Sequence, residues 1–230
     1  MKKLYEPNGL LHWDQHSIYI RNMIANYLVM EVTNKLKELN RAFEIIKCEA
    51  PILTPEEFIN TNYTKVDVFY ALDDLVLRPE TTAGSYEYAK YLLSHGDHKP
   101  YKLPLCVWQH GKSFRKEQDK VLSHMRLKEF YQLEFQIIYS PESKCDYPTF
   151  MTTATCSSLA RILDNKYGEC HIEPSDRLPS YSEFTNDIVY KNNGNIMELA
   201  SISQRTDFEN AKVLEIAIGT DRCVYQFINK

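Results

Sequence analysis

The sequence lacks any long hydrophobic run, and no apolar stretch approaches the roughly 18 residues that cross a membrane. Its first residues, MKKLYEPNGLLHWD, lack the apolar segment of a secretory signal. Internal repeats and low-complexity tracts are absent as well. A net charge of -4 excludes a protein-wide positive surface for nucleic acid, so any contact with RNA has to be local. These absences predict a cytoplasmic protein that has no membrane partner.

The six cysteines show no CxxC spacing, which argues against a structural zinc site or a redox pair. Because no secretory signal precedes them, we expect reduced and mostly buried thiols. Cys170 and His171 are adjacent, and such a pair without further ligands seldom binds a metal. The sequence does contain 230 residues, of which 43% are hydrophobic and 25% charged. This composition predicts one globular domain with a substantial core.

Residues 108–139 carry the most informative pattern in the chain. The alternation of apolar and polar residues predicts a strand, a polar loop at 118–123 and a strand that returns to Tyr139. Because alternate residues of a strand point to the same face, one face of the returning strand carries Arg126, Lys128, Phe130, Gln132 and Glu134. Such a face makes a poor core but fits a polyanion with an aromatic base. The alternative interpretation is the solvated face of an ordinary antiparallel hairpin.

The same stretch resembles motif 2 of the class II aminoacyl-tRNA synthetases. The most similar form is that of the glycyl-tRNA synthetases, which runs QxGxSFRxE, a loop, RxREF and a later glutamate. The residues that match this pattern without a gap are Gln109, Gly111, Ser113, Phe114, Arg115, Glu117, Arg126, Glu129, Phe130 and Glu134. Lys128 stands where the family has an arginine.

A second segment, RPETTAG at residues 78–84, resembles the RPETAQG segment of the glycyl-tRNA synthetases. In that family the glutamate faces the ammonium group of the amino acid, and Glu80 takes this place here. Arg78 lies two residues earlier, and Ala83 stands where the family has glutamine. From the residues alone, the segment is a strand, a proline turn and a helix at 85–93, whose start is either a cap or a ligand site.

A third segment, ELASISQRTDFE at residues 198–209, follows a strong hairpin signal at 192–195. It resembles the ELxGIxxRTDYDL segment of the same family. In class II enzymes the first glutamate, with a serine or glycine three residues later, lies at the magnesium ion that bridges the ATP phosphates. Glu198 and Ser201 take these places, and a hard cation prefers such oxygen ligands.

The end of the chain resembles motif 3, with a strand, Gly219 as a turn and a helix that carries Arg222 in its first turn. In the family this arginine binds the γ-phosphate. The glycyl-tRNA synthetases have Glu-Pro-Ser shortly before the glycine, with the glutamate and the serine at the amino acid. Here the triplet is Glu215-Ile216-Ala217, so the carboxylate is kept and the hydroxyl is lost.

The remaining elements follow from periodicity and turn signals. A long amphipathic helix at 17–39, a strand at 43–48 and Pro51 resemble motif 1, which forms the dimer interface in the family. Thr54 and Pro55 predict a short helix at 55–58, and strands are expected at 66–70 and 75–77. We also expect a helical insertion at about 141–180, with its helix at 149–167, and a strand at 187–190.

The resemblance implies an α/β (α+β) fold with an antiparallel sheet of about six strands flanked by helices. We expect residues 1–230 to form a single catalytic domain without the anticodon-binding domain of the family. The implied cofactors are ATP and Mg²⁺, and the implied assembly is a homodimer.

Carried over residue by residue, the resemblance also implies a nucleotide site beside an amino-acid site. The implied catalytic residues are Arg115 and Arg222. The residues implied to bind ATP are Arg115, Glu117, Arg126, Phe130, Glu198 and Arg222, and those implied to hold Mg²⁺ are Glu198 and Ser201. The residues implied to bind the amino acid are Arg78, Glu80, Glu134, Glu215 and Ala217. Because three carboxylates gathered without a cation would raise each other's pKa, Glu80, Glu134 and Glu215 are expected around the substrate ammonium group.

The expected reaction is activation of a small, glycine-like amino acid to an aminoacyl-adenylate. The acyl group would then pass to the acceptor end of a tRNA or to another acceptor. The alternative is a non-catalytic accessory or binding subunit that has kept the fold and the dimer interface. The substitutions at Ala83, Lys128 and Ala217 keep this alternative open.

Overall fold

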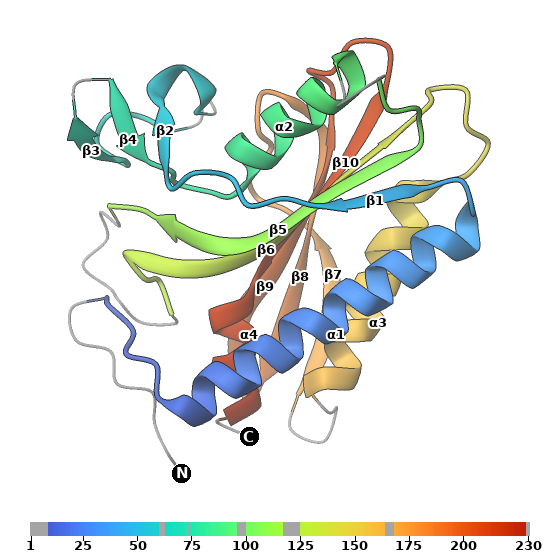
Figure 1. Cartoon of the computed structure of the whole chain (residues 1–230). Coiled ribbons are helices and arrows are strands. Elements are labelled where there is room, and N and C mark those ends of the chain that lie inside the picture. Colours follow the sequence, from blue (N-terminus) through green and yellow to red (C-terminus); the bar gives the residue numbers. More distant parts are fainter. Residues whose placement is uncertain are drawn as a thin grey trace.

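A seven-stranded sheet forms the centre of the structure, a computed structural model that describes residues 9–59, 63–72, 74–95, 100–116, 125–163 and 168–228. Its strand order is β1-β5-β6-β10-β9-β8-β7 (Figure 1). The strands are β1 (Glu44–Lys47), β5 (Leu105–Phe114), β6 (Glu129–Tyr139), β7 (Glu169–Pro174), β8 (Ser182–Asn192), β9 (Asn195–Arg205) and β10 (Lys212–Gly219). All neighbouring pairs are antiparallel except β1 and β5, which are parallel.

The expectation of about six antiparallel strands therefore needs two corrections. The described sheet has seven strands, because β7 adds an edge strand beside β8. Its other edge is parallel, because the chain leaves β1, crosses a small sheet and a helix, and re-enters at β5 in the same direction. A parallel pair needs such a long crossover connection. The mixed α/β character with flanking helices is confirmed.

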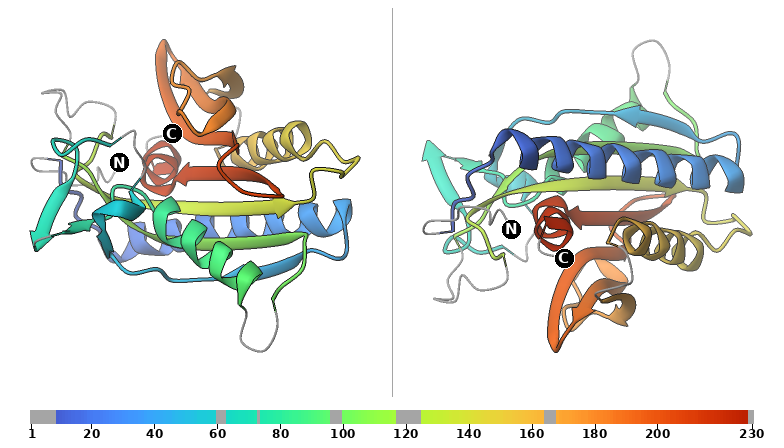
Figure 2. Two further views of the ribbon diagram at one scale, coloured as in Figure 1. Left: turned by 90° about the horizontal axis from the view of Figure 1, so that it is seen from above. Right: turned by 90° about the horizontal axis from the view of Figure 1, so that it is seen from below.

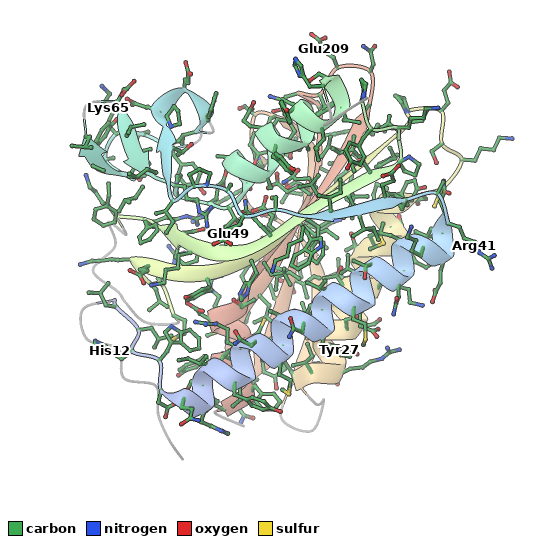
Figure 3. The ribbon with its side chains drawn as sticks, viewed as in Figure 1. His12, Tyr27, Arg41, Glu49, Lys65 and Glu209 are labelled. Atoms are coloured by element: carbon green, nitrogen blue, oxygen red, sulfur yellow. The ribbon has the colours of Figure 1, made fainter. Side chains whose placement is uncertain are left out.

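Three helices cover one face of the sheet, and one helix covers the other face (Figures 1 and 2). The first layer consists of α1 (Gln15–Leu39), α3 (Tyr147–Leu163) and α4 (Thr220–Ile228), and α2 (Thr82–Ser94) lies opposite. Side chains fill the space between α1 and the sheet (Figure 3). The predicted helix at 17–39 is confirmed and begins two residues earlier, because the Asp14 carboxylate caps it by accepting a 2.7 Å hydrogen bond from the Ser17 N–H.

The two faces of the sheet have different chemistry. On the α1 face, buried side chains such as Leu133, Phe135 and Ile216 form the main core. On the α2 face, Tyr86, Ala89 and Leu92 of the helix pack on Leu105, Val107, Ile138 and Val213 of the sheet. Beyond the N-terminal end of α2, the side chains on this second face are mostly polar.

A small sheet with the order β2-β4-β3 stands beside the large one. It consists of β2 (Leu53–Pro55), β3 (Phe69–Leu72) and β4 (Leu75–Leu77), and a 3-10 turn, η1 (Glu56–Phe58), follows β2. The prediction that Thr54 caps a helix is wrong, because Thr54 pairs with Val76 as part of a strand. The predicted strand at 66–70 begins later than expected, at Phe69.

The returning strand of the motif 2 segment also differs from the prediction. β6 begins at Glu129, so Arg126 and Lys128 precede it and do not belong to its ladder. Two backbone hydrogen bonds of Lys128 hold the chain just before β6. Its N–H donates to the Gly9 carbonyl, and its carbonyl accepts from the Arg115 N–H. The predicted loop at 118–123 lies outside the described residues. Phe130, Gln132 and Glu134 do share one strand face, as predicted.

The range 141–180 is not a purely helical insertion. It contains α3, which ends earlier than the predicted helix at 149–167, and also the sheet strand β7. Met151, Leu159 and Leu163 of α3 are fully buried in the main core, so this range belongs to the packed domain. The hairpin at 192–195 is confirmed, with positive φ angles of 47° at Asn193 and 81° at Gly194.

The six cysteines are free thiols, as predicted, and Cys106, Cys156 and Cys223 are buried. None of the helices in the described residues is both long enough and apolar enough to cross a membrane.

Candidate active site

A cavity of about 410 Å³ lies on the polar part of the α2 face of the sheet. Its floor comes from β6, β8, β9 and β10, and its far end from the first turn of α4. Tyr63, Glu80 and Arg115 line one end, and a segment at 175–181 lines one side. A polar floor arises because alternate residues of each strand point to this face, where helix packing has ended. The size is within the range of small-molecule sites.

One end of the cavity is built around Glu80, in the turn between β4 and α2. The Tyr63 hydroxyl donates a 2.8 Å hydrogen bond to Oε2 of Glu80, and Nη2 of Arg115 lies 4.0 Å from the same oxygen. Arg115 donates its Nε–H to the carbonyl of Pro79 at 2.9 Å, which fixes its side chain. Burial raises the pKa of Glu80, and the nearby charge of Glu215 adds to this effect against the attraction of Arg115. This carboxylate is therefore poised to accept a cationic group.

Arg115 also connects this end of the cavity to its aromatic wall. Its guanidinium carbon lies 5.2 Å from the ring centre of Tyr63 and 5.1 Å from that of Phe130. Contact with two aromatic rings restricts the plane of a guanidinium group. Arg115 thus presents a fixed positive charge between Glu80 and Phe130.

Glu215 lies at the same end but is already paired. Its Oε2 accepts a 2.7 Å hydrogen bond from Nη1 of Arg205 and a 3.2 Å bond from the Gln136 amide. Arg205 is buried between the rings of Tyr86 and Tyr181, each 4.0 Å from its guanidinium carbon. A buried carboxylate needs such a partner to stay ionised. Arg205 also binds the Asp207 carboxylate through Nε and Nη2, so it shares its charge between Glu215 and Asp207.

Glu134 is fully buried and lies behind the cavity, outside its lining. The Thr81 hydroxyl donates to its Oε2 at 2.7 Å, and the Gln136 amide donates to its Oε1 at 2.7 Å. Burial raises the pKa of Glu134 to about 8, with further contributions from the charges of Glu215 and Glu80. The prediction that Glu134 contacts the amino acid directly is therefore not supported by its position.

The position of Arg78 also differs from what its predicted role in binding the amino acid requires. It is buried and does not line the cavity. Its guanidinium donates to the carbonyls of Lys112 at 2.8 Å and Ala50 at 2.6 Å, so its donors hold the backbone of the scaffold together. A β-carbon at Gly111 would lie 2.3 Å from Nη2 of Arg78, which explains the glycine there. Arg78 thus lies behind the cavity and supports its scaffold, and it is not part of the lining.

The other end of the cavity carries Arg222 and Glu198. Nη1 of Arg222 donates to the backbone carbonyl of Glu198 at 2.8 Å and lies 3.3 Å from its carboxylate. Ser201 lines the same region, opposite Asp187 in the β8–β9 ladder. Burial raises the pKa of Asp187, and the nearby Ser175 and Ser201 hydroxyls act in the opposite direction. Hard oxygen donors from Glu198, Ser201 and Asp187 thus face one part of the cavity.

These oxygens fit a cation that completes its coordination with water or phosphate. Within the described residues, no group of three or more His, Cys, Asp or Glu side chains is arranged to hold a metal ion. A closed, protein-only metal cage is thus absent from the described part of the chain. Mg²⁺ commonly binds through one or two protein oxygens together with substrate phosphates, and the donor set matches that mode.

Three further residues of the predicted site are part of the cavity wall, and their roles stay predictions. Arg126, Phe130 and Ala217 line the cavity together with the residues above. Glu117 lies outside the described residues. The lining or supporting side chains that the sequence analysis missed include Tyr63, Asp187, Arg205 and Asp221.

For two of the missed residues the sequence held a signal. Arg205 has the strand parity of Ser201 and Ser203, and a charged residue at an inward position implies a buried partner. Asp187 likewise shares its strand face with the buried Thr185. Tyr63 follows no periodic pattern, so its contact with Glu80 could not be read from the sequence.

Comparison with known proteins identifies the family. Residues 65–222 match the model of a family described as the tRNA synthetase class II core domain (G, H, P, S and T). The chain belongs to this family. This synthetase core is 31% identical over 144 residues to the glycine–tRNA ligases of Staphylococcus aureus strains JH9 and Newman, covering 62% of the chain and 30% of each relative.

A solved structure shares the fold. The prolyl-tRNA synthetase of Cryptosporidium parvum, complexed with halofuginone and AMPPNP, superposes with a TM-score of 0.72 and 17% sequence identity. The match covers 98% of this chain and 48% of the other. The class II catalytic fold predicted from the sequence is therefore confirmed. The chain spans about a third of the length of the curated relatives it matches.

Proposed function

We propose that this class II core activates a small amino acid with ATP, releasing pyrophosphate and forming an aminoacyl-adenylate. One observation carries the proposal: a single cavity holds a carboxylate, Glu80, at one end and a cation, Arg222, at the other. Arg115 contacts both the Glu80 carboxylate and the Phe130 ring. An amino acid and a nucleotide need these groups in this order to meet at an α-phosphate.

The amino acid would bind at the Glu80 end. Glu80 would accept the ammonium group, held in place by the Tyr63 hydroxyl. Arg205 binds Glu215 and Asp207, and Glu134 lies behind the wall, so Glu80 would be the carboxylate that accepts the one ammonium group. Ala217 and the nearby ring of Tyr181 line this region and favour a small side chain such as that of glycine.

The nucleotide would bind between Phe130 and Arg222. The Phe130 ring offers a stacking surface for adenine, and Arg222 would cover the base from the other side while binding the γ-phosphate. Arg126 lines the cavity nearby and would bind phosphate. By resemblance to motif 2, Glu117 would accept from the adenine amine. AMPPNP, an ATP analogue, is part of the prolyl-tRNA synthetase complex of the same fold, which supports this assignment.

Glu198 and Ser201 would hold Mg²⁺, with Asp187 beside them. When bound, the ion supplies positive charge to the ATP phosphates. Arg222 pairs with Glu198 at 3.3 Å and so keeps this carboxylate pointed along the cavity. Ser201 lies opposite Asp187 in the β8–β9 ladder, so both side chains belong to the same region of the cavity.

The chemistry requires no general base. An oxygen of the amino-acid carboxylate, which is ionised at neutral pH, attacks the α-phosphorus. The bond from that phosphorus to the bridging oxygen breaks, and pyrophosphate leaves with the electron pair. Negative charge grows on the α-phosphate oxygens, and Arg115 would stabilise it from its fixed position. Catalysis would rest on positioning and on charge neutralisation.

Two partners belong to the same proposal. The acyl group would pass to the acceptor end of a tRNA or to another acceptor, as class II relatives are tRNA ligases by name. The chain would form a homodimer through α1, whose outward side chains Ile18, Tyr19, Met23 and Met30 are exposed in the single chain. Exposed apolar side chains gathered on one helix are typical of an interface.

The second candidate is a non-catalytic accessory subunit. Ala217 lacks the hydroxyl that the resembled family has at this position, and Glu215 is occupied by Arg205. Both features weaken the contacts available to a substrate ammonium group. Such a subunit would keep the fold and the dimer and would show no amino-acid-dependent reaction of ATP.

Amino-acid-dependent exchange between ATP and pyrophosphate separates the two candidates. We expect exchange with glycine, and alanine and serine should be tested separately. Arg115→Ala should abolish the signal, because the α-phosphate loses its cation. Arg161→Ala is the matched control, since Arg161 pairs with Glu31 on the surface of α3, away from the cavity. A folded dimer without exchange for any amino acid would contradict the proposal and favour the accessory subunit.

A further inference from the structure

The first two residues of α4 are bound to a single residue of β6. The β10–β6 ladder ends where Gly219 pairs with Gln132, and the chain then enters α4 at Thr220. At the next position along β6, the Thr220 hydroxyl donates a 3.1 Å hydrogen bond to the Tyr131 carbonyl. The Asp221 carboxylate accepts a 3.0 Å hydrogen bond from the Tyr131 N–H. We call Thr220, Asp221 and Tyr131 the strand–helix tie.

In this tie, side chains form the hydrogen bonds to Tyr131 that the backbone of β10 would form if the strand continued. When a strand stops, the N–H and C=O groups of its neighbour lose their partners, and buried groups of this kind are costly. Here both groups of Tyr131 are satisfied by side chains that are 0% and 2% exposed. The start of α4 is therefore fixed against β6 by two buried hydrogen bonds.

His110 completes the arrangement. Its Nε2 lies 3.1 Å from the Thr220 hydroxyl oxygen. Burial lowers the pKa of His110 to about 4, with help from the charges of Arg21 and Lys47, so the ring is neutral near pH 7. A neutral ring with its proton on Nε2 can donate to the hydroxyl oxygen, which leaves the hydroxyl proton for the Tyr131 carbonyl.

The Asp221 carboxylate serves the tie and not its own helix. Its Oδ2 binds the Tyr131 N–H, while its Oδ1 has no hydrogen-bond partner within the described residues. An aspartate in the first turn of a helix commonly caps the free N–H groups there. The Tyr131 ring is held from the other side as well, with the Arg21 guanidinium carbon 3.8 Å from its centre and Trp13 edge-on at 6.1 Å.

The tie joins the two backbone segments that carry the lining residues Phe130 and Arg222. Tyr131 stands between Phe130 and Gln132 on β6, and Asp221 directly precedes Arg222 on α4. Phe130 and Arg222 both line the cavity. We propose that Thr220 and Asp221 are positioning residues that set the width of the adenine slot between Phe130 and Arg222. The proposal rests on the proposed function, since it assumes that adenine binds there.

Four variants of the full chain test the role of the tie. Thr220→Val keeps the shape and removes the hydroxyl, and Asp221→Ala removes the acceptor. Thr220→Ser and Asp221→Asn each keep the required group and serve as rescue variants. Thr33→Val is the matched control, because the Thr33 hydroxyl bonds only to backbone carbonyls of its own helix α1.

Calorimetric titration with ATP and Mg²⁺, and separately with glycine, gives the decisive readout. We expect Thr220→Val and Asp221→Ala to bind ATP about tenfold more weakly, because one buried hydrogen bond is lost in each. Their glycine affinity should be unchanged, because the Glu80 end is untouched. The rescue variants should stay within about twofold of the wild-type chain, as one good partner remains.

Two results would overturn the tie as a positioning device. One is wild-type ATP affinity in folded Thr220→Val and Asp221→Ala. The other is an equal loss of ATP and glycine binding, which indicates general damage. If the wild-type chain binds no ATP, the proposed function fails and the slot proposal fails with it. Amide exchange at Tyr131 then tests the hydrogen bond alone: faster exchange in Asp221→Ala but not in Asp221→Asn supports the tie, and equal exchange refutes it.

Discussion

At the scale of single residues, the charge balance around Glu80 decides what the cavity can bind. The sequence supplied three carboxylates for this end, but it did not reveal that Arg205 binds Glu215 at 2.7 Å or that Glu134 is fully buried. Pairing between side chains from different strands depends on register, which a single sequence does not specify. Of the three carboxylates, Glu80 and Glu215 line the cavity, and Glu80 accepts from the Tyr63 hydroxyl and lies 4.0 Å from Nη2 of Arg115.

Glu134 gives a pH-dependent prediction at this scale. Its pKa rises from 4.5 to about 8 on folding, so between these values the folded chain binds more protons than the unfolded chain. The free energy of unfolding of the wild-type chain should therefore fall as the pH rises through this window. Glu134→Gln stays neutral, and its amide can still pair with the Thr81 hydroxyl and the Gln136 side chain.

We expect Glu134→Gln to be more stable than the wild-type chain near pH 8 and to lose this advantage towards pH 4.5. Denaturant unfolding at a series of pH values measures the difference. Glu209→Gln, in the exposed turn before β10, is the matched control (Figure 3). A difference that does not vary with pH would show that Glu134 is ionised in the folded chain.

At the scale of elements, local patterns predicted most of the helices and strands but not all of the pairings between strands. The helix at 17–39, the 192–195 hairpin and the strand-to-helix turn at Gly219 were predicted because each has a local signal: periodicity, Asn-Gly or glycine. β7 was missed because a short edge strand has little alternation of its own. The parallel pairing of β1 with β5 was missed because it joins segments far apart in the sequence.

The N-cap of α1 provides a prediction for this scale. Asp14→Ala removes the acceptor of the Ser17 N–H and should lower the free energy of unfolding by about 1 kcal/mol. Asp14→Ser offers an equivalent oxygen and should retain most of that stability. Thermal or denaturant unfolding measures both variants. Equal stability of Asp14→Ala and the wild-type chain would indicate that α1 is held by packing alone.

At the scale of the whole molecule, the fold places a polar cavity beside a packed helix layer. α1 reaches across the sheet and presents apolar side chains outward, and Tyr19 is 67% exposed in the single chain. The described residues of this class II core form both ends of one cavity. The segments that resemble the family converge on one face of the sheet and line this cavity, while the roles of their residues stay predictions.

The proposed dimer gives a prediction at the same scale. Sedimentation velocity should show twice the chain mass for the wild-type protein. Tyr19→Glu should shift it towards the monomer, because a charge in a buried interface costs more than in water. Ile196→Glu is the control, as Ile196 is similarly exposed at 58% on β9 and lies outside α1. A wild-type monomer at every concentration, or a dimer unaffected by Tyr19→Glu, would contradict assembly through this face.

Mass-spectrometric detection of an aminoacyl-adenylate on the protein tests most directly whether this cavity joins an amino acid to ATP. Incubation of the wild-type chain with ATP, Mg²⁺ and glycine should yield glycyl-adenylate. Glu80→Gln should lose the product while still binding ATP, because it removes the carboxylate for the ammonium group, whereas Arg115 stays bound to the Pro79 carbonyl. A wild-type chain that binds both ATP and glycine yet forms no adenylate, with glycine, alanine or serine, would contradict the proposed reaction.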